Sequence, residues 1–151
     1  MTAKRLLQRG DSGVSEPQAN SSALRREEKS MPNGKQVILV VEDHPIIRMG
    51  AVELVRSAGF DAIEAETADE AIRILESRAD IRLVFTDVEM PGTMDGHKLA
   101  LYVRDRWPPV MLIVASGKRI IAESALPPGT RFFQKPYNDN AIVEAIIGML
   151  A

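Results

Sequence analysis

The chain has no cysteine, few aromatic residues and no long hydrophobic run, and each absence excludes a class of protein. Without cysteine, none of its 151 residues forms a disulfide, a thiolate metal site or a thiol nucleophile. No apolar stretch approaches the roughly 18 residues that a transmembrane helix needs. We therefore expect no membrane insertion, and a cysteine-free chain fits the reducing cytoplasm.

Aromatic residues make up 5% of the sequence, and the charge is unevenly distributed. Residues 1–36 carry seven basic and four acidic side chains, whereas the rest of the chain carries 12 basic and 17 acidic ones. An acidic body with few aromatic rings is poorly suited to nucleic acid, whose phosphates attract lysine and arginine. We therefore expect no direct nucleic-acid partner.

Residues 1–35 differ in composition from the rest of the chain. They are rich in serine, glycine, asparagine, glutamine and charged residues, without sustained periodicity, which predicts a disordered leader. Met31 comes shortly before the first apolar run and is an alternative start, in which case the leader is a cloning or start-site artefact. The composition places the folded domain at residues 36–151.

From residue 36 onward, strand-like and helix-like segments alternate. Continuous apolar or β-branched runs predict strands, and apolar residues at helical spacing predict helices. This alternation predicts a doubly wound α/β fold, in which helices cover both faces of a five-stranded parallel sheet. The predicted strands are 36–42, 60–66, 81–87, 110–116 and 130–135; the predicted helices are 46–58, 68–78, 95–107, 119–125 and 139–150.

Polar residues stand where four of the predicted strands end. The first strand ends at Glu42 and Asp43, the third at Asp87, the fourth at Ser116 and the fifth at Lys135. Parallel strands bring their carboxyl ends to one edge of the sheet, where ligands bind. Three clustered carboxylates repel each other unless a cation shares the site, and carboxylate oxygens suit Mg²⁺.

This combination of groups predicts phosphoryl chemistry. A carboxylate beside Mg²⁺ and a lysine can attack phosphorus and form an aspartyl phosphate. Each residue alone also has a structural interpretation, as a helix N-cap, a turn former or a solvated charge. Their coincidence at successive strand ends favours a site.

Four motifs carry a resemblance to a known family. VILVVEDHPIIR, LVFTDVEMPGTMDG, LIVASG and FFQKPY together resemble the receiver domain of bacterial two-component response regulators, over about residues 36–151. The resemblance implies a flavodoxin-like sheet with strand order 2-1-3-4-5. Because no segment follows Ala151, we expect a stand-alone, single-domain response regulator that signals through its own surface or relays the group.

The resemblance also implies a role for each residue at the strand ends. Asp87 would accept the phosphoryl group, and Glu42 and Asp43 would serve Mg²⁺. The hydroxyl of Ser116 would contact the phosphoryl group, and Lys135 would bind its oxygens. The phosphoryl donor would be a phosphohistidine of a histidine kinase or a histidine phosphotransfer protein, and the phosphorylated form would act on a downstream protein target.

Three further features are implied by the same resemblance. The backbone carbonyl of Glu89 would complete the protein ligands of Mg²⁺. The Lys135–Pro136 peptide would be cis. Phe132 occupies the position of an aromatic switch residue, for which core packing is the alternative interpretation.

The sequence departs from the family pattern around the site. MPGTMDG is one residue longer than usual, so we expect a different loop after Asp87. Glu89 and Lys118 stand where the family tunes access of water to the acyl phosphate, and an ion pair between them would slow hydrolysis. Two independent surface charges are the alternative interpretation.

The predicted helix 119–125 is short and runs into two prolines, so no dimerisation mode is carried over.

Two other function classes compete with a phosphoacceptor that catalyses only its own phosphorylation and dephosphorylation. One is a receiver-like adaptor that binds partners without phosphorylation. The other is a phosphatase of the haloacid dehalogenase type. Such an enzyme places a second aspartate two residues after the nucleophile, where this chain has Glu89, and carries a cap domain, for which the sequence offers no segment.

Overall fold

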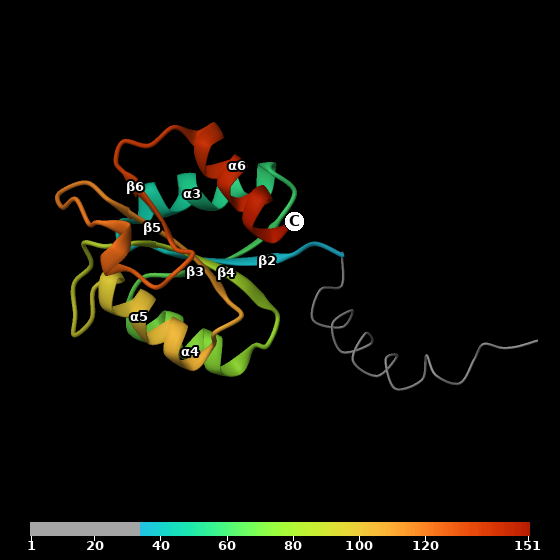
Figure 1. Cartoon of the computed structure of the whole chain (residues 1–151). Helices are drawn as coiled ribbons and strands as arrows, with labels where there is room; N and C mark the ends of the chain where they lie inside the picture. The colour runs from blue at the N-terminus through green and yellow to red at the C-terminus, as the bar shows by residue number, and fades with distance from the viewer. Residues whose placement is uncertain (1–33) are drawn as a thin grey trace, which may run out of the picture. The chain divides into compact units, whose positions relative to one another are not determined.

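Five parallel strands form the middle layer of the part of the chain that the structure, a computed structural model, describes: residues 34–151 (Figure 1). The predicted leader, apart from residues 34 and 35, lies outside the described residues. In chain order the elements are β2 (Val37–Val41), α3 (Pro45–Ser57), β3 (Asp61–Ala65), α4 (Ala68–Ser77), β4 (Ile81–Asp87), α5 (Gly96–Arg106), β5 (Met111–Ser116), the 3-10 helix η1 (Glu123–Ala125), β6 (Arg131–Gln134) and α6 (Asp139–Leu150).

The sheet order is β3-β2-β4-β5-β6, and every neighbouring pair is parallel. Counted along the chain this is 2-1-3-4-5, which confirms the predicted topology. Helices α3 and α6 cover one face of the sheet, and α4 and α5 cover the other (Figure 1). The order reverses between β2 and β4, so the carboxyl ends of these two strands flank the crevice where doubly wound sheets bind ligands.

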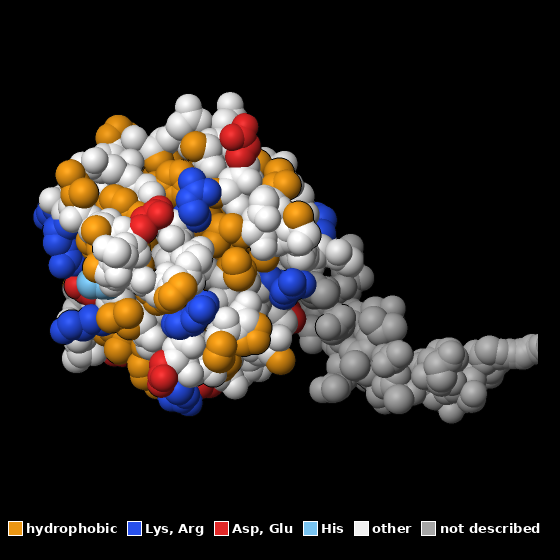
Figure 2. All heavy atoms as spheres, viewed as in Figure 1, with side chains coloured by type: hydrophobic (Ala, Val, Ile, Leu, Met, Phe, Trp, Pro, Cys, Tyr) orange, Lys and Arg blue, Asp and Glu red, His pale blue; other side chains and the backbone are white. Residues whose placement is uncertain are grey.

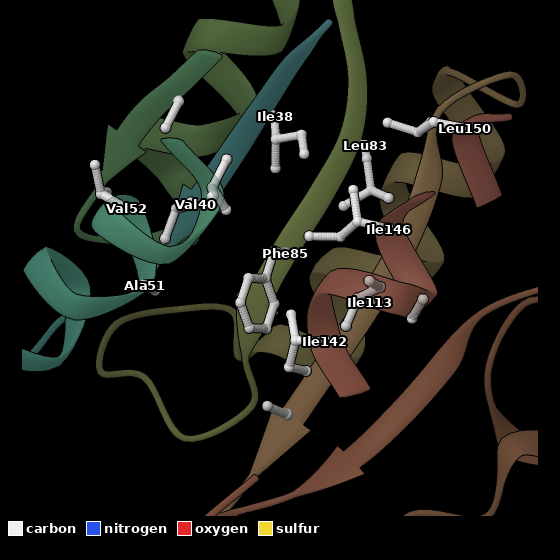
Figure 3. Packing of buried hydrophobic residues seen from close by; sticks show 14 residues of the cluster. Ile38, Val40, Ala51, Val52, Leu83, Phe85, Ile113, Ile142, Ile146 and Leu150 are labelled. Carbon is white, nitrogen blue, oxygen red and sulfur yellow. The ribbon is translucent and has the colours of Figure 1, made fainter. Parts of the chain in front are cut away.

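The three central strands are buried because their sequences are mostly apolar. All five residues of β2 are buried, and so are six of the seven in β4. Burying one such side chain contributes about 1.5–3 kcal/mol, so this layer holds the strand ends rigidly. Figure 3 shows how side chains of the strands pack against α3 and α6; its labelled residues are Ile38, Val40, Ala51, Val52, Leu83, Phe85, Ile113, Ile142, Ile146 and Leu150.

A side chain caps the first turn of each α-helix. His44, Thr67, Asp95 and Asn138 each accept a hydrogen bond from a backbone N–H two or three residues further on. Such caps satisfy donors that have no partner inside the helix and contribute about 1 kcal/mol each. They also fix where each helix begins relative to the strand end before it.

The predicted helix 119–125 is wrong. The described segment contains one 3-10 turn, Glu123–Ala125, between β5 and β6. Pro127 disfavours the helical conformation of Leu126, which is extended and ends the turn. Polar contacts hold the segment instead: His97 Nε2 lies 2.8 Å from the carbonyl oxygen of Ala125, and Glu123 accepts a hydrogen bond from the Phe132 N–H.

The outer surface is mixed in character. On the face shown in Figure 2, acidic and basic side chains alternate with hydrophobic ones rather than gathering into one charged region. Within residues 34–151, no helix combines the length and apolar character that a membrane span requires.

Gly96, the first residue of α5, sits directly against the end of β4. Its N–H donates to the carbonyl of Val88 at 2.9 Å, and a Cβ at this position would overlap the backbone carbonyl of Asp87. The glycine therefore lets the helix approach the strand end that carries Asp87.

We predict that Gly96→Ala lowers the free energy of unfolding by about 1–3 kcal/mol, because the backbone of β4 must shift to make room. Gly50→Ala is the matched control: Gly50 lies within α3 with open space around its Cα, so the change should raise stability by about 0.5–1 kcal/mol. Urea unfolding followed by circular dichroism measures both. Equal effects of the two changes would contradict the packing at Gly96.

Candidate functional site

The polar residues that end the strands gather at the carboxyl edge of the sheet, as predicted. Glu42 directly follows β2, Asp87 ends β4, Ser116 ends β5, and Lys135 directly follows β6. Glu42, Asp87 and Ser116 are 5%, 6% and 0% exposed. These are unusual values for acidic and hydroxyl side chains, which are found mostly on the surface.

Three carboxylates form the centre of this site. Ligand oxygens of Glu42, Asp43 and Asp87 all lie within 4.8 Å of one another. Asp43 is half-buried, so the cluster opens to solvent on its side. Oxygen donors at this spacing, with room for water, form the kind of site that Mg²⁺ occupies.

Lys135 supplies the positive charge nearest to this cluster. Its Nζ lies 3.0 Å from Glu42 Oε1 and 2.8 Å from Asp87 Oδ1. Beyond this ion pair with Lys135, the buried Oδ1 of Asp87 has no hydrogen-bond partner among the described residues. One ammonium group therefore faces a buried carboxylate oxygen that is only partly satisfied, and this fits the addition of a cation.

The electrostatics of the cluster are governed by burial and by like charges. Burial raises the pKa of Asp87 to about 6; the charges of Glu42 and Glu89 add to this rise, and Lys135 opposes it. Burial alone would lower the pKa of Lys135, but the neighbouring Asp87 and Glu42 outweigh it and raise that pKa. The lysine thus stays protonated at neutral pH, while ionised Asp87 lacks full compensation.

Glu89 lies against the end of β5, where the sequence analysis did not place it. Its carboxylate accepts hydrogen bonds from the Ser116 hydroxyl and from the Gly117 N–H, the latter at 3.0 Å. Its ion pair is with Arg119, at 3.8 Å, and not with Lys118, so the predicted Glu89–Lys118 pair does not form among the described residues. The backbone N–H of Arg119 donates a hydrogen bond to Ser116 Oγ at 2.9 Å, and this contact holds Arg119 beside the site.

Arg119 and Asp95 are members of the site that the sequence analysis missed. The Arg119 Nη2 lies 2.8 Å from Asp95 Oδ2, and Asp95 also caps α5. Only the position of Asp95 in the MDG motif carried a signal; nothing in the spacing distinguished Arg119 from Lys118.

The remaining predictions concern the loops beside the site. The Lys135–Pro136 peptide is cis, as predicted. Phe132 is half-buried on β6. In the lengthened loop after Asp87, Gly92 has a φ of 103°, a left-handed conformation that favours glycine.

The family of the chain is established by comparison with known sequences. Residues 38–147 match the response regulator receiver domain. The chain belongs to this receiver family. It is 30% identical over 149 residues to the sensor kinase CckA of Brucella abortus, covering 91% of this chain and 15% of that protein. It is 38% identical over 88 residues to the sensor histidine kinase RcsC of Salmonella typhimurium, covering 58% of this chain and 9% of that protein.

Solved structures show the same fold. The receiver domain of the hybrid histidine kinase CckA is 30% identical, with a TM-score of 0.64 over 76% of this chain and 99% of that one. A response regulator receiver protein from Sinorhizobium medicae, 24% identical, has a TM-score of 0.72 over 78% and 95% of the two chains. The receiver domain thus spans a small part of the curated relatives it matches.

The raised pKa of Asp87 predicts how stability depends on pH in buffer without divalent metal. Because the Asp87 carboxyl binds its proton more tightly in the folded receiver than in the unfolded chain, this carboxyl stabilises the fold at low pH. That contribution is lost as the pH rises through about 6. Asp87→Asn removes this dependence, so its stability relative to wild type should grow by about 2 kcal/mol between about pH 4.5 and about pH 8.

Chemical unfolding in EDTA across this range measures the difference. Asp69→Asn, a change of the same kind in the first turn of α4, is the control for a general effect of removing one acidic group. A stability difference between Asp87→Asn and wild type that does not vary with pH would contradict the electrostatic account of the cluster.

Proposed function

We propose that this receiver accepts a phosphoryl group on Asp87 from a phosphohistidine of a histidine kinase or a histidine phosphotransfer protein. The observation that carries the proposal is the buried Asp87 carboxylate, 2.8 Å from Lys135 and within 4.8 Å of the other two acids. The relatives CckA and RcsC are named as sensor kinases, and this supports a histidine kinase as the donor.

In this reaction an oxygen of Asp87 attacks the phosphorus atom. The new P–O bond forms as the P–N bond of the phosphohistidine breaks, and the electron pair of that bond returns to the imidazole. Lys135 balances negative charge on the transferred group, since its raised pKa keeps it protonated. Burial of the strand end limits the access of water to the acyl phosphate.

The proposal includes Mg²⁺, for which the donor set is suitable. Glu42, Asp43 and Asp87 would hold the ion, together with the carbonyl of Glu89. Clustered carboxylates, and a buried oxygen of Asp87 that has no partner besides Lys135 in the described part of the chain, support this assignment. When bound, Mg²⁺ neutralises charge on the phosphoryl oxygens. Ser116, at the end of the neighbouring strand, would donate a hydrogen bond to one of those oxygens.

The two competing functions have less support. A haloacid dehalogenase-type phosphatase needs a free acid two residues after the nucleophile, but the Glu89 carboxylate is engaged by Ser116 and Gly117. A phosphorylation-independent adaptor does not require three clustered acids, whose like charges oppose one another. We propose that the phosphorylated receiver binds a downstream protein or passes the group on.

We predict that acetyl phosphate adds one phosphoryl group to the wild-type protein in the presence of Mg²⁺, and none in EDTA or in Asp87→Asn. Intact-mass spectrometry measures the gain. Asp69→Asn is the control and should be labelled like wild type. Absence of labelling both from acetyl phosphate and from a phosphorylated histidine phosphotransfer protein would contradict the proposal and favour the adaptor.

A further inference from the structure

Both oxygens of the Glu89 carboxylate are bound to donors at the carboxyl end of β5. Oε2 accepts the Ser116 hydroxyl, and Oε1 accepts the Gly117 N–H at 3.0 Å. Glu89 reaches this position from the loop after β4, only two residues beyond Asp87. A negatively charged group of this chain thus occupies two adjacent donors beside the proposed phosphoacceptor.

These donors lie where an anion on Asp87 would meet them. Asp87 is paired with Ala115 across β4 and β5, so Ser116, the last residue of β5, and Gly117, which follows it, come next along the chain. On its other side, Gly117 lies next to Lys135, whose side chain would be 3.7 Å from a Cβ on this glycine. The hydroxyl and the amide therefore belong to residues that neighbour both Asp87, through the strand pairing, and the Lys135 side chain, through packing.

A network of charges holds Glu89 in this place. Burial alone would raise the pKa of Glu89, but hydrogen bonds from Ser116, Gly117 and the Lys118 backbone, together with the charge of Arg119, lower it. Arg119 is held in turn by Asp95 at 2.8 Å. Glu89 is therefore ionised at neutral pH, and its hydrogen bonds to these donors are charge-assisted.

We propose that Glu89 is an internal competitor, which occupies the phosphoryl-binding donors of the resting receiver and must leave before the phosphoryl group can use them. The inference rests on the proposed role of Asp87. The Ser116 hydroxyl has one proton, and the Gly117 amide has one, so neither can serve Glu89 and a phosphoryl oxygen fully at once. Phosphorylation thereby releases Glu89, and with it the ion pair to Arg119.

With competition of this kind, the apparent affinity equals the intrinsic affinity multiplied by the fraction of molecules in which the donors are free. We expect Glu89→Ala to bind a phosphoryl analogue, beryllofluoride with Mg²⁺, at least about tenfold more tightly than wild type, because one charge-assisted hydrogen bond corresponds to a factor of about ten or more. Fluorine NMR or calorimetry gives the dissociation constants. Asp87→Asn should not bind the analogue.

A double-mutant cycle separates competition from simple removal of a nearby negative charge. In Ser116→Ala, Glu89 has lost one of its two donors. The factor by which Glu89→Ala tightens analogue binding should therefore be at least about threefold smaller in this background than in wild type. Removal of charge alone would give the same improvement in both backgrounds. Lys118→Ala, which changes an exposed neighbour, is the matched control and should shift the affinity less than about threefold.

The outcomes distinguish this inference from the proposed function. Tighter binding by Glu89→Ala that shrinks in the Ser116→Ala background supports both. Wild-type binding that depends on Asp87, with no improvement in Glu89→Ala or with equal improvement in both backgrounds, overturns the competitor and leaves the phosphoacceptor standing. No binding of the analogue to wild type or to Glu89→Ala overturns the phosphoacceptor and the competitor with it.

Discussion

The contact of Lys135 with Glu42 and Asp87 is the interaction on which the site depends. Two carboxylates are buried at the ends of adjacent strands, and burial of a charge is costly unless an opposite charge compensates it. A single ammonium group, 3.0 Å and 2.8 Å from the two acids, supplies part of that compensation. The remaining excess of negative charge, shared with Asp43, makes this edge of the sheet suited to a divalent cation.

The fold brings these charges together from distant parts of the sequence. Glu42 and Lys135 are 93 residues apart, yet they meet because β2 and β6 run parallel and end at the same edge. Mostly apolar sequences bury β2, β4 and β5, and this burial fixes the position at which each strand ends. The close approach of Gly96 to Asp87 then sets the loop that carries Glu89 toward β5.

The sequence predicted the strands, their order and the residues at their ends, because those depend on local apolar patterning and on motifs that can be read in one chain. It did not predict the absence of a full helix before β6, where Pro127 and side-chain contacts decided the conformation. It also misassigned the partner of Glu89. Motif position favoured Lys118 over its basic neighbour Arg119, but the choice between them depends on a backbone hydrogen bond to Ser116 that only three-dimensional structure defines.

The central claim is that Asp87 is the residue that becomes phosphorylated. The most direct test is to treat the phosphorylated protein with borohydride, which reduces an aspartyl phosphate to homoserine, and to sequence the resulting peptides by mass spectrometry. The account predicts homoserine at position 87 in the peptide that contains the end of β4, and at no other aspartate. Homoserine at Asp43 or elsewhere, with Asp87 unchanged, would contradict it.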